Sequence, residues 1–283
     1  MLRIALQKSG RLSEDSLHLI EECGIKINNG KGKLKSSAEN FDAEFIFFRD
    51  DDIPGYVADG VADVGIIGEN IFHEKGKDVK VVMKLGFSKC RLSLAIPKSR
   101  EYKGLGDFNK TNIATSYPRI LRKFLKQNNI NADIHEISGS VEIAPGIGLA
   151  DAICDLVSSG STLLTNGLKE VEVIMHSEAV LISNKNLSSD KLSKLSDFIF
   201  RIEAVRHARN NKYILLNAPN EKIQDIIKIL PGMKSPTIIP LALEGWSSIH
   251  SVINEDKFWE IIGQLKKAGA EGILVVPIEK MIL

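Results

Sequence analysis

Short apolar runs alternate with polar segments over the first two thirds of the chain, and their spacing changes between strand-like and helix-like. Runs compact enough for buried strands lie at 2–6, 44–48, 64–67, 79–85, 92–96, 112–114, 152–157 and 171–182. Apolar positions with helical spacing occur at 13–23, 118–128 and 190–210. Gly24 suits a helix end, and Pro118 suits a first helical turn. This alternation predicts an α/β fold.

Two segments of the chain share one pattern. GVADVGIIGEN at 60–70 is similar to GLADAICDLVS at 148–158, with Asp63 and Asp151 in the same place. A strand, a polar loop and a helix start can be read upstream of each segment. Two such halves would form two lobes whose ligand loops face each other across a cleft. The alternative is that ordinary α/β units resemble each other by pattern alone.

The last part of the chain has a different pattern. It predicts, in order, strand, helix, strand, strand, helix and strand at 212–217, 220–230, 237–241, 247–253, 256–268 and 272–277. This βαββαβ order is that of the ferredoxin-like fold. The segment contains no cluster of residues typical of a catalytic site. We therefore expect a regulatory or oligomerisation module, with a purely structural cap as the alternative.

Composition excludes several classes of protein. Of the 283 residues, 43% are hydrophobic and 26% charged, as in ordinary globular proteins, and the length suggests two or three domains. The net charge of +1 gives no electrostatic reason to expect nucleic acid or a membrane surface as a partner. The three cysteines are scattered and the six histidines show no ligand spacing with them, so we expect reduced thiols, no structural zinc and a cytoplasmic protein. The N-terminus is too polar for a signal peptide, and no apolar stretch is long enough to span a bilayer.

The apolar run at 152–157 leads into a loop that is suited to a phosphate ester. The loop offers hydroxyl and backbone N–H groups with no bulky side chain in the way: Ser158, Ser159, Gly160, Ser161 and Thr162. A helix that begins near Ser161 would add the favourable field of its N-terminus. Asp155 and Asp151 can address a sugar hydroxyl or a metal ion. The alternative is a plain strand-to-helix connection.

Six blocks of sequence, taken together, resemble the long form of ATP phosphoribosyltransferase, the family that opens histidine biosynthesis. The blocks are LRIALQKSGRLSEDS, FRDDDIPGYVADGVADVGIIGEN, CRLSLAIP, IATSYPRIL, GSVEIAPGIGLADAICDLVSSGSTL and GILVVPIEKM. The resemblance covers essentially the whole chain. It implies two catalytic lobes like type II periplasmic binding proteins and a ferredoxin-like domain that binds histidine. We place the first lobe at 1–95 with a return segment at about 171–185, the second at 96–170, and the regulatory domain at 211–283.

The resemblance also implies a reaction. ATP and 5-phosphoribosyl 1-diphosphate would give N1-(5-phospho-β-D-ribosyl)-ATP and diphosphate, assisted by Mg²⁺ whose ligands remain unassigned. The implied assemblies are a homodimer and a homohexamer, with histidine as an inhibitor. A two-lobed small-molecule-binding protein without catalysis is the alternative, because the same lobes serve as solute receptors and as effector domains of transcription regulators. The chain shows no basic helix-turn-helix segment that would indicate a regulator.

Several residues are expected to bind substrate. We expect catalytic roles for Lys8, Arg11, Arg49 and Glu142, since cations at strand ends can bind diphosphate and an acid can stabilise a cationic centre. Other expected substrate contacts are Ser9, Gly10, Asp50, Asp51, Glu69, Arg91, Ser116, Tyr117, Asp151, Asp155 and the loop residues 158–162. Each cation can instead be a solvated surface charge. Asp50 and Asp51 can instead favour a helix start, and Tyr117 can stack on a base or pack between the lobes.

The histidine site is expected at a subunit contact in the last domain. Its residues would be Ser235, Pro236, Thr237, Ala270 and Ile273. Backbone groups and the Thr237 hydroxyl would satisfy the amino and carboxylate ends of the ligand. The chain has Ala218 and Pro219 where some relatives carry an aspartate, which leaves the partner of the ligand's amino group open.

Overall fold

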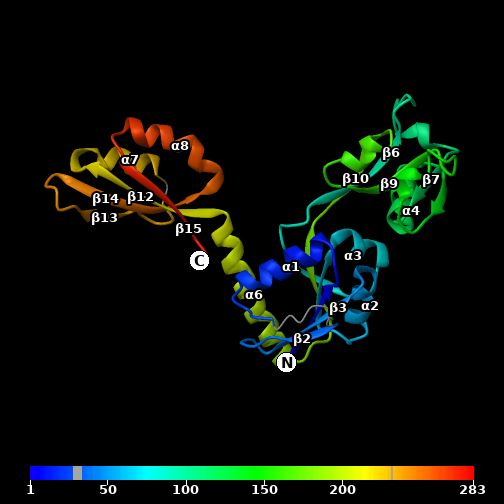
Figure 1. The fold of residues 1–283 in the computed structure, drawn as a ribbon, viewed down its shortest axis with the longest axis horizontal. Helices are drawn as coiled ribbons and strands as arrows, with labels where there is room; N and C mark the ends of the chain where they lie inside the picture. The colour runs from blue at the N-terminus through cyan, green and yellow to red at the C-terminus, as the bar shows by residue number, and fades with distance from the viewer. Residues whose placement is uncertain (28–33, 231) are drawn as a thin grey trace. The chain divides into compact units, whose positions relative to one another are not determined.

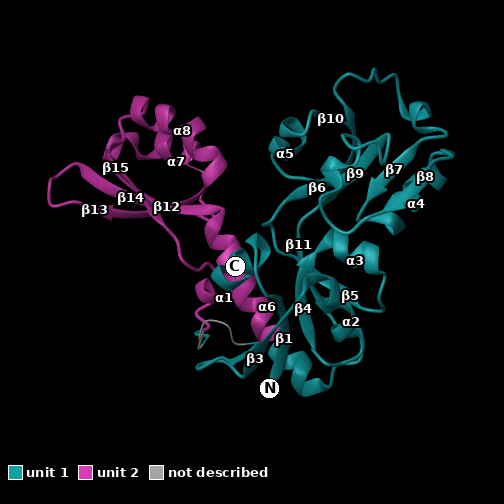
Figure 2. Cartoon of the chain, turned by 45° about the vertical axis from the view of Figure 1, so that its right-hand side comes forward, with its two compact units in different colours: residues 1–18, 26–194 teal, residues 19–25, 195–283 magenta. Residues whose placement is uncertain are grey.

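The structure, a computed structural model, describes residues 1–27, 34–230 and 232–283. The chain divides into two compact units, which Figure 2 shows in two colours. Residues 1–18 and 26–194 form the first unit, and residues 19–25 and 195–283 form the second. No helix in the described part of the chain has the length and apolar character needed to cross a membrane.

The first sheet of unit 1 has the strand order β2-β3-β1-β4-β11-β5. Figure 1 labels two of its strands, β2 and β3. The strands of this sheet are β1 (Leu2–Gln7), β2 (Lys35–Ser37), β3 (Ala43–Phe48), β4 (Val64–Gly68), β5 (Lys80–Lys84) and β11 (Ala179–Ser183). The helices after these strands are α1 (Arg11–Glu22), the 3-10 helix η1 (Asp50–Asp52), α2 (Ile53–Ala58) and α3 (Glu69–Lys75). β1 pairs in parallel with β3 and β4, whereas β11 is antiparallel to both β4 and β5. We call this sheet and its helices lobe I.

The second sheet of unit 1 has the order β10-β6-β9-β7-β8. Its strands are β6 (Cys90–Pro97), β7 (Asn112–Thr115), β8 (Asp133–Glu136), β9 (Ala152–Val157) and β10 (Leu168–Ser177). The helices are η2 (Leu105–Phe108), α4 (Pro118–Gln127), η3 (Val141–Ile143) and α5 (Ser161–Thr165). β7 is parallel to β8 and β9, and β6 is antiparallel to β9 and β10. We call this sheet and its helices lobe II.

The two sheets repeat one topology, as the two similar sequence segments predict. In each sheet a central strand has a parallel strand on either side, followed by an antiparallel strand. Asp63 accepts the N–H of Arg3 at 2.8 Å and donates its own N–H to the Arg3 carbonyl. Asp151 makes the same pair of bonds with Asn112. The two aspartates therefore do one structural task at matching places, which confirms the two-lobed fold.

The structure divides one predicted strand. The apolar run 171–182 is read in sequence as continuous, but β10 lies in lobe II and β11 in lobe I. The chain changes sheets at Glu178, whose carbonyl accepts the N–H of Glu69 at 2.9 Å. β6 also lies in the second sheet, although the expected lobe boundary at residue 95 assigns most of it to the first. Apolar pattern reports burial and not the sheet in which a strand is buried, so neither feature could be read from sequence.

Close packing between α2 and β4 leaves room only for glycine at one position of lobe I. A Cβ at Gly65 in β4 would lie 2.6 Å from the Cγ2 of Ile53, at the start of α2. Val57 of α2 is next to the same place. Because any larger side chain would push α2 off the sheet, Gly65 lets the helix rest directly on the strand. The helix then starts immediately after the acidic segment at the end of β3.

The long helix α6 spans Ser189–Arg209, and its residues from Leu195 onward belong to unit 2. Unit 2 also contains the predicted ferredoxin-like domain. Its elements are β12 (Asn211–Pro219), η4 (Asn220–Lys222), α7 (Ile223–Ile229), β13 (Thr237–Pro240), β14 (Trp246–Asn254), α8 (Glu255–Lys267) and β15 (Glu271–Pro277). The sheet order is β13-β14-β12-β15, and all neighbours are antiparallel. Ile226 of α7 and Leu265 of α8 are fully buried against the sheet. The βαββαβ prediction is confirmed.

The paired aspartates generate a stability prediction. Asp63 is 3% exposed and also forms ion pairs with Arg3 and Lys191, whereas Asp151 is exposed. Asp63→Ala should lower the free energy of unfolding by about 2–4 kcal/mol, because it leaves a buried N–H without an acceptor. The control Asp151→Ala should cost about 1 kcal/mol or less, because water can replace the lost carboxylate. Urea denaturation measures both, and equal losses would contradict this account.

Candidate active site

Most of the expected substrate contacts lie where the parallel strands of the two sheets end. Lys8 and Ser9 follow β1, Asp50 follows β3, Tyr117 follows β7 and Ser158 follows β9. Ligands of α/β folds bind at this edge of the sheet, because strands end there and helices begin. Contacts between the two lobes bring several of these residues together.

The loop after β9 has the form expected of a phosphate site. Gly160 has a φ of +81°, a conformation that side chains rarely adopt, and α5 begins at the next residue. The hydroxyl oxygens of Ser159 and Ser161 lie 2.9 Å apart. Ser158, Ser159, Ser161 and Thr162 are all exposed. The loop thus presents several hydroxyl groups to one place.

Two arginines reach this loop from different elements. Arg11, at the start of α1 in lobe I, lies 3.5 Å from the Ser158 hydroxyl. Arg91 of β6 donates to the Ser158 carbonyl at 3.2 Å. The Glu170 carboxylate of β10 accepts two hydrogen bonds of 2.5 Å from the Arg91 guanidinium. The Ser93 hydroxyl donates to the same carboxylate at 2.7 Å. Arg91 is therefore held in place, whereas Arg11 makes one long contact and keeps donors free for a ligand.

Acidic groups from both lobes lie near Tyr117. Burial, together with the carboxylate of Glu142, raises the pKa of Asp155 to about 6. Burial also raises the pKa of the Tyr117 hydroxyl, with further contributions from Asp155 and from Asp50. The pKa of Asp50 is itself raised, by burial and then by Asp51. The site therefore combines a cationic side at Ser158 with an anionic side around Tyr117.

The two lobes hold Tyr117 between them. Its ring packs against the apolar clusters of both sheets. Its N–H donates to Thr115 Oγ1 at 2.9 Å, and Asn70 of lobe I acts to lower the pKa of its hydroxyl, against the larger effect of burial. The repeat in the sequence gave a signal for Asn70, because it stands where Ser158 stands in the second segment. No such signal marked Glu170, which stands between Lys169 and Val171, just before the predicted apolar run.

Glu74 of α3 is a further residue that sequence reasoning missed. One of its carboxylate oxygens accepts the N–H of Arg119 at 2.9 Å, and the other accepts that of Ile120 at 3.0 Å. These N–H groups belong to the first turn of α4, whose own N-cap, Tyr117, makes no side-chain capping bond. A residue of lobe I thus caps a helix of lobe II, and no local pattern could reveal a cap so distant in sequence.

Other expected contacts lie elsewhere or have other partners. Asp151 is at the start of β9, about 20 Å along the strand from the loop at its end, and serves the structural role described above. Glu69 pairs with Lys84 at 2.8 Å. The Ser116 hydroxyl donates to the Ile137 carbonyl at 2.7 Å. We therefore leave these three residues out of the proposed site.

The remaining expected residues stay available for substrate. Lys8 and Arg49 are exposed, and neither forms an ion pair with another residue in the part of the chain that the structure describes. Gly10 has a φ of +94° and turns the chain from β1 into α1. Asp51 lies 3.4 Å from Lys75. Glu142 stands on η3, which follows Ser140 in a left-handed conformation that is strained for serine.

The expected histidine residues lie in unit 2. Thr237 begins β13 and is exposed, and Ala270 is buried beside β15. Ser251 of β14 has a buried hydroxyl with no hydrogen-bond partner in the described residues. A Cβ at Gly232 would lie 2.9 Å from this hydroxyl and 3.3 Å from the Pro236 nitrogen. The segment that carries Ser235 and Pro236 therefore folds close to an unsatisfied polar group.

Fold and site together define a two-lobed α/β enzyme that acts on a phosphate ester. Comparison with known protein families shows to which family of enzymes the chain belongs. The family description "ATP phosphoribosyltransferase" matches residues 49–204, and "HisG, C-terminal domain" matches residues 208–280. The chain belongs to the ATP phosphoribosyltransferase family, in its long form, and its reaction is the first step of histidine biosynthesis.

Individual relatives agree over the full length. An ATP phosphoribosyltransferase of Parabacteroides distasonis is 62% identical, with 100% of both chains covered. That of Cytophaga hutchinsonii is 61% identical, covering 100% of this chain and 99% of the relative. Among solved structures, the ATP phosphoribosyl transferase (HisG:HisZ) complex from Thermotoga maritima is similar, with a TM-score of 0.63 and 27% identity. The alignment covers 72% of this chain and 97% of that one.

The raised pKa of Asp155 leads to a pH-dependent prediction. The folded protein holds this proton up to about pH 6, whereas the unfolded chain releases it near the ordinary aspartate pKa of 3.8. Stability from this group is therefore present below pH 4 and is lost as the pH rises through 6. Asp155→Asn should raise stability by roughly 1–2 kcal/mol at pH 7.5 and by less at pH 5, while activity falls. Urea midpoints at both pH values check this, and a difference that is the same at both would contradict it.

Proposed function

We propose that the 5′-phosphate of 5-phosphoribosyl 1-diphosphate binds at residues 158–162. The observation that carries the proposal is the approach of two guanidinium groups, from Arg11 and Arg91, to the hydroxyl-rich turn around Gly160. A phosphate dianion accepts many hydrogen bonds, and bonds to charged groups are stronger than neutral ones. Hydroxyls set around a left-handed glycine and backed by fixed positive charge are suited to such a ligand.

The leaving diphosphate would lie toward the end of β1. Arg11 has donors to spare there, and the exposed Lys8 and Arg49 follow neighbouring strands. Negative charge grows on the diphosphate as its bond to the ribose breaks. Cations held in place for that charge stabilise the transition state more than the ground state. We therefore assign leaving-group stabilisation to Arg11, Lys8 and Arg49.

The ribose carbon becomes cationic as diphosphate departs, and the carboxylates of Asp155 and Glu142 would stabilise it. Asp155 is ionised at neutral pH, since even its raised pKa is about 6. Adenine N1 carries no proton at this pH, so its attack on the opposite face needs no general base. Catalysis would then rest on orientation, which is worth up to ~7–11 kcal/mol, and on charge stabilisation.

We place the adenine ring beside Tyr117. The tyrosine ring packs against the apolar clusters of both lobes, and this packing holds the ring in one position for contact with the base. Asp50 lies close enough to raise the pKa of the Tyr117 hydroxyl, and can accept a hydrogen bond from the adenine amine. Positioning against a rigid aromatic group requires no movement of the side chain on binding.

Magnesium would be held mainly by the substrate. No group of three or more metal-ligating side chains occurs among residues 1–27, 34–230 and 232–283. Mg²⁺ is commonly bound by one or two carboxylates together with substrate phosphates, so Asp155 and Glu142 fit as its protein partners. When bound, the ion would neutralise charge on the diphosphate.

We propose that the ferredoxin-like domain makes the enzyme sensitive to histidine. The hydroxyl of Ser251 has no hydrogen-bond partner among the described residues and lies near Gly232, which supports a polar ligand near residues 235–237. Ala270 and Ile273, around the start of β15, would complete the site. Homodimers and homohexamers in the cytoplasm would be the working form. Inhibition requires that histidine bind one state of the assembly better than another.

Thr162→Ala tests the phosphate assignment. Loss of one donor to a charged group costs roughly 1.5–3 kcal/mol, so the KM for 5-phosphoribosyl 1-diphosphate should rise about tenfold or more while that for ATP changes little. Thr165→Ala is the matched control, because the Thr165 hydroxyl lies in the last turn of the same short helix and already donates to the Ser161 carbonyl. A parallel rise in both constants, or none, would show that the loop does not hold this phosphate.

The regulatory assignment is tested with Thr237→Ala. We expect the histidine concentration for half inhibition to rise about fivefold or more, with the uninhibited rate unchanged, because Thr237 belongs to unit 2. A chain that ends before Asn211 should lose inhibition altogether. Histidine that competes directly with 5-phosphoribosyl 1-diphosphate, or that still inhibits the shortened chain, would overturn the assignment.

A further inference from the structure

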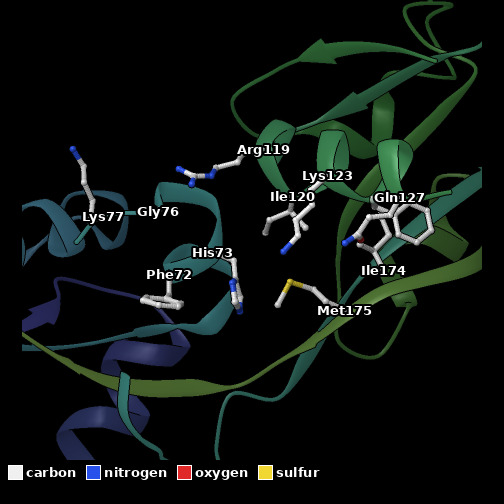
Figure 3. Close-up of a pocket in the computed structure, with 11 residues that line it drawn as sticks. Phe72, His73, Gly76, Lys77, Arg119, Ile120, Lys123, Gln127, Ile174 and Met175 are labelled. Atoms are coloured by element: carbon white, nitrogen blue, oxygen red, sulfur yellow. The ribbon is translucent and has the colours of Figure 1, made fainter. Parts of the chain in front are cut away.

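Unit 1 contains a cavity that is separate from the proposed active site. It has a volume of about 440 Å³ and is bounded by α3 of lobe I and by α4 and β10 of lobe II (Figure 3). None of the residues proposed above to bind ATP or 5-phosphoribosyl 1-diphosphate lines it. A cavity of this size is typical of sites for small organic molecules.

The walls of the cavity are apolar and come from both lobes. Phe72 of α3 contributes one side, and Ile120 and Phe124 of α4 contribute another, with Ile174 and Met175 of β10. In Figure 3, Met175 extends toward the α3 side of the cavity. All but Ile120 are only partly buried, so apolar surface remains in contact with water. Aromatic rings and a thioether favour a flat, apolar occupant.

The charged groups around the cavity are cationic. Arg119, Lys123 and Lys77 line it, and no aspartate or glutamate does. Lys123 has no ion-pair partner in the described part of the chain. The neighbouring Glu74 is occupied, since both of its oxygens accept N–H groups of α4. The cavity therefore favours an anion.

The guanidinium of Arg119 lies at the rim of the cavity. It donates to the Lys75 carbonyl at 3.4 Å, at the end of α3. A Cβ at Gly76 would lie 2.0 Å from this guanidinium, so only glycine admits the arginine there. Among the described residues no carboxylate pairs with this guanidinium, so its positive charge remains beside the apolar walls.

We propose that this cavity binds a small aromatic acid, a flat ring system that carries one carboxylate or phosphate group. The ring lies between Phe72, Phe124 and Met175, and the anionic group meets Lys123 and Arg119. Such an occupant contacts both lobes at once. It occupies a site separate from those of ATP and 5-phosphoribosyl 1-diphosphate.

Calorimetric titration of the full-length protein with 1-naphthoate and with 1-naphthyl phosphate tests the proposal. At least one probe should bind the wild type with a Kd below ~1 mM, and the tighter one identifies the preferred anionic group. Lys123→Glu should weaken binding about tenfold, because attraction becomes repulsion. The control Lys126→Glu, on the same helix but outside the cavity, should change it less than twofold.

Two further measurements separate this site from the active site. Saturating ATP with 5-phosphoribosyl 1-diphosphate should leave probe binding unchanged, and Gln127→Trp, which fills the cavity from its exposed rim, should abolish it at unchanged turnover. Failure of both probes to bind, displacement by the substrates, or equal effects of Lys123→Glu and Lys126→Glu would overturn the proposal.

Discussion

The active site depends on the way the chain passes between its two sheets. Lobe II is inserted between β5 and β11 of lobe I, so the chain leaves near residue 87 and returns at residue 178. The two passages are hydrogen-bonded to each other: Ala179 donates to the Phe87 carbonyl at 3.0 Å, and Leu85 donates to the Ala179 carbonyl at 2.8 Å. Ser177 and Asn70 bond each other beside them. This junction brings the carboxyl ends of both sheets to one place.

The site also concentrates unfavourable charge. Asp155 and Asp50 are partly buried, both have raised pKa values, and both raise the pKa of the Tyr117 hydroxyl. Such an arrangement weakens the fold, and in the proposed mechanism it stabilises a cationic centre that forms only during the reaction. Glu170 neutralises Arg91 on the opposite side, whereas Arg11, Lys8 and Arg49 form no ion pair in the described part of the chain. In the proposed site, one arginine is therefore neutralised by a carboxylate, and the other cations can bind substrate phosphates.

Much of this organisation could be predicted from sequence, because it follows local patterns. The alternation of strands and helices, the repeat around Asp63 and Asp151, and the βαββαβ order of the last domain are all visible in spacing. What could not be predicted depends on contacts between distant residues. The cap that Glu74 provides for α4, the grip of Glu170 on Arg91 and the division of the run 171–182 between two sheets are of this kind. The role of Asp151 is also of this kind, since its carboxylate, at the start of β9, bonds the backbone N–H of the distant Asn112 and does not reach the loop at the end of that strand.

A crystal structure with bound 5-phosphoribosyl 1-diphosphate tests the central claim most directly. We expect the 5′-phosphate to lie within hydrogen-bonding distance of the Ser159 and Thr162 hydroxyls, with the diphosphate toward Arg11. A 5′-phosphate at Lys8 and Arg49 instead, with the loop at 158–162 free of ligand, would contradict the account.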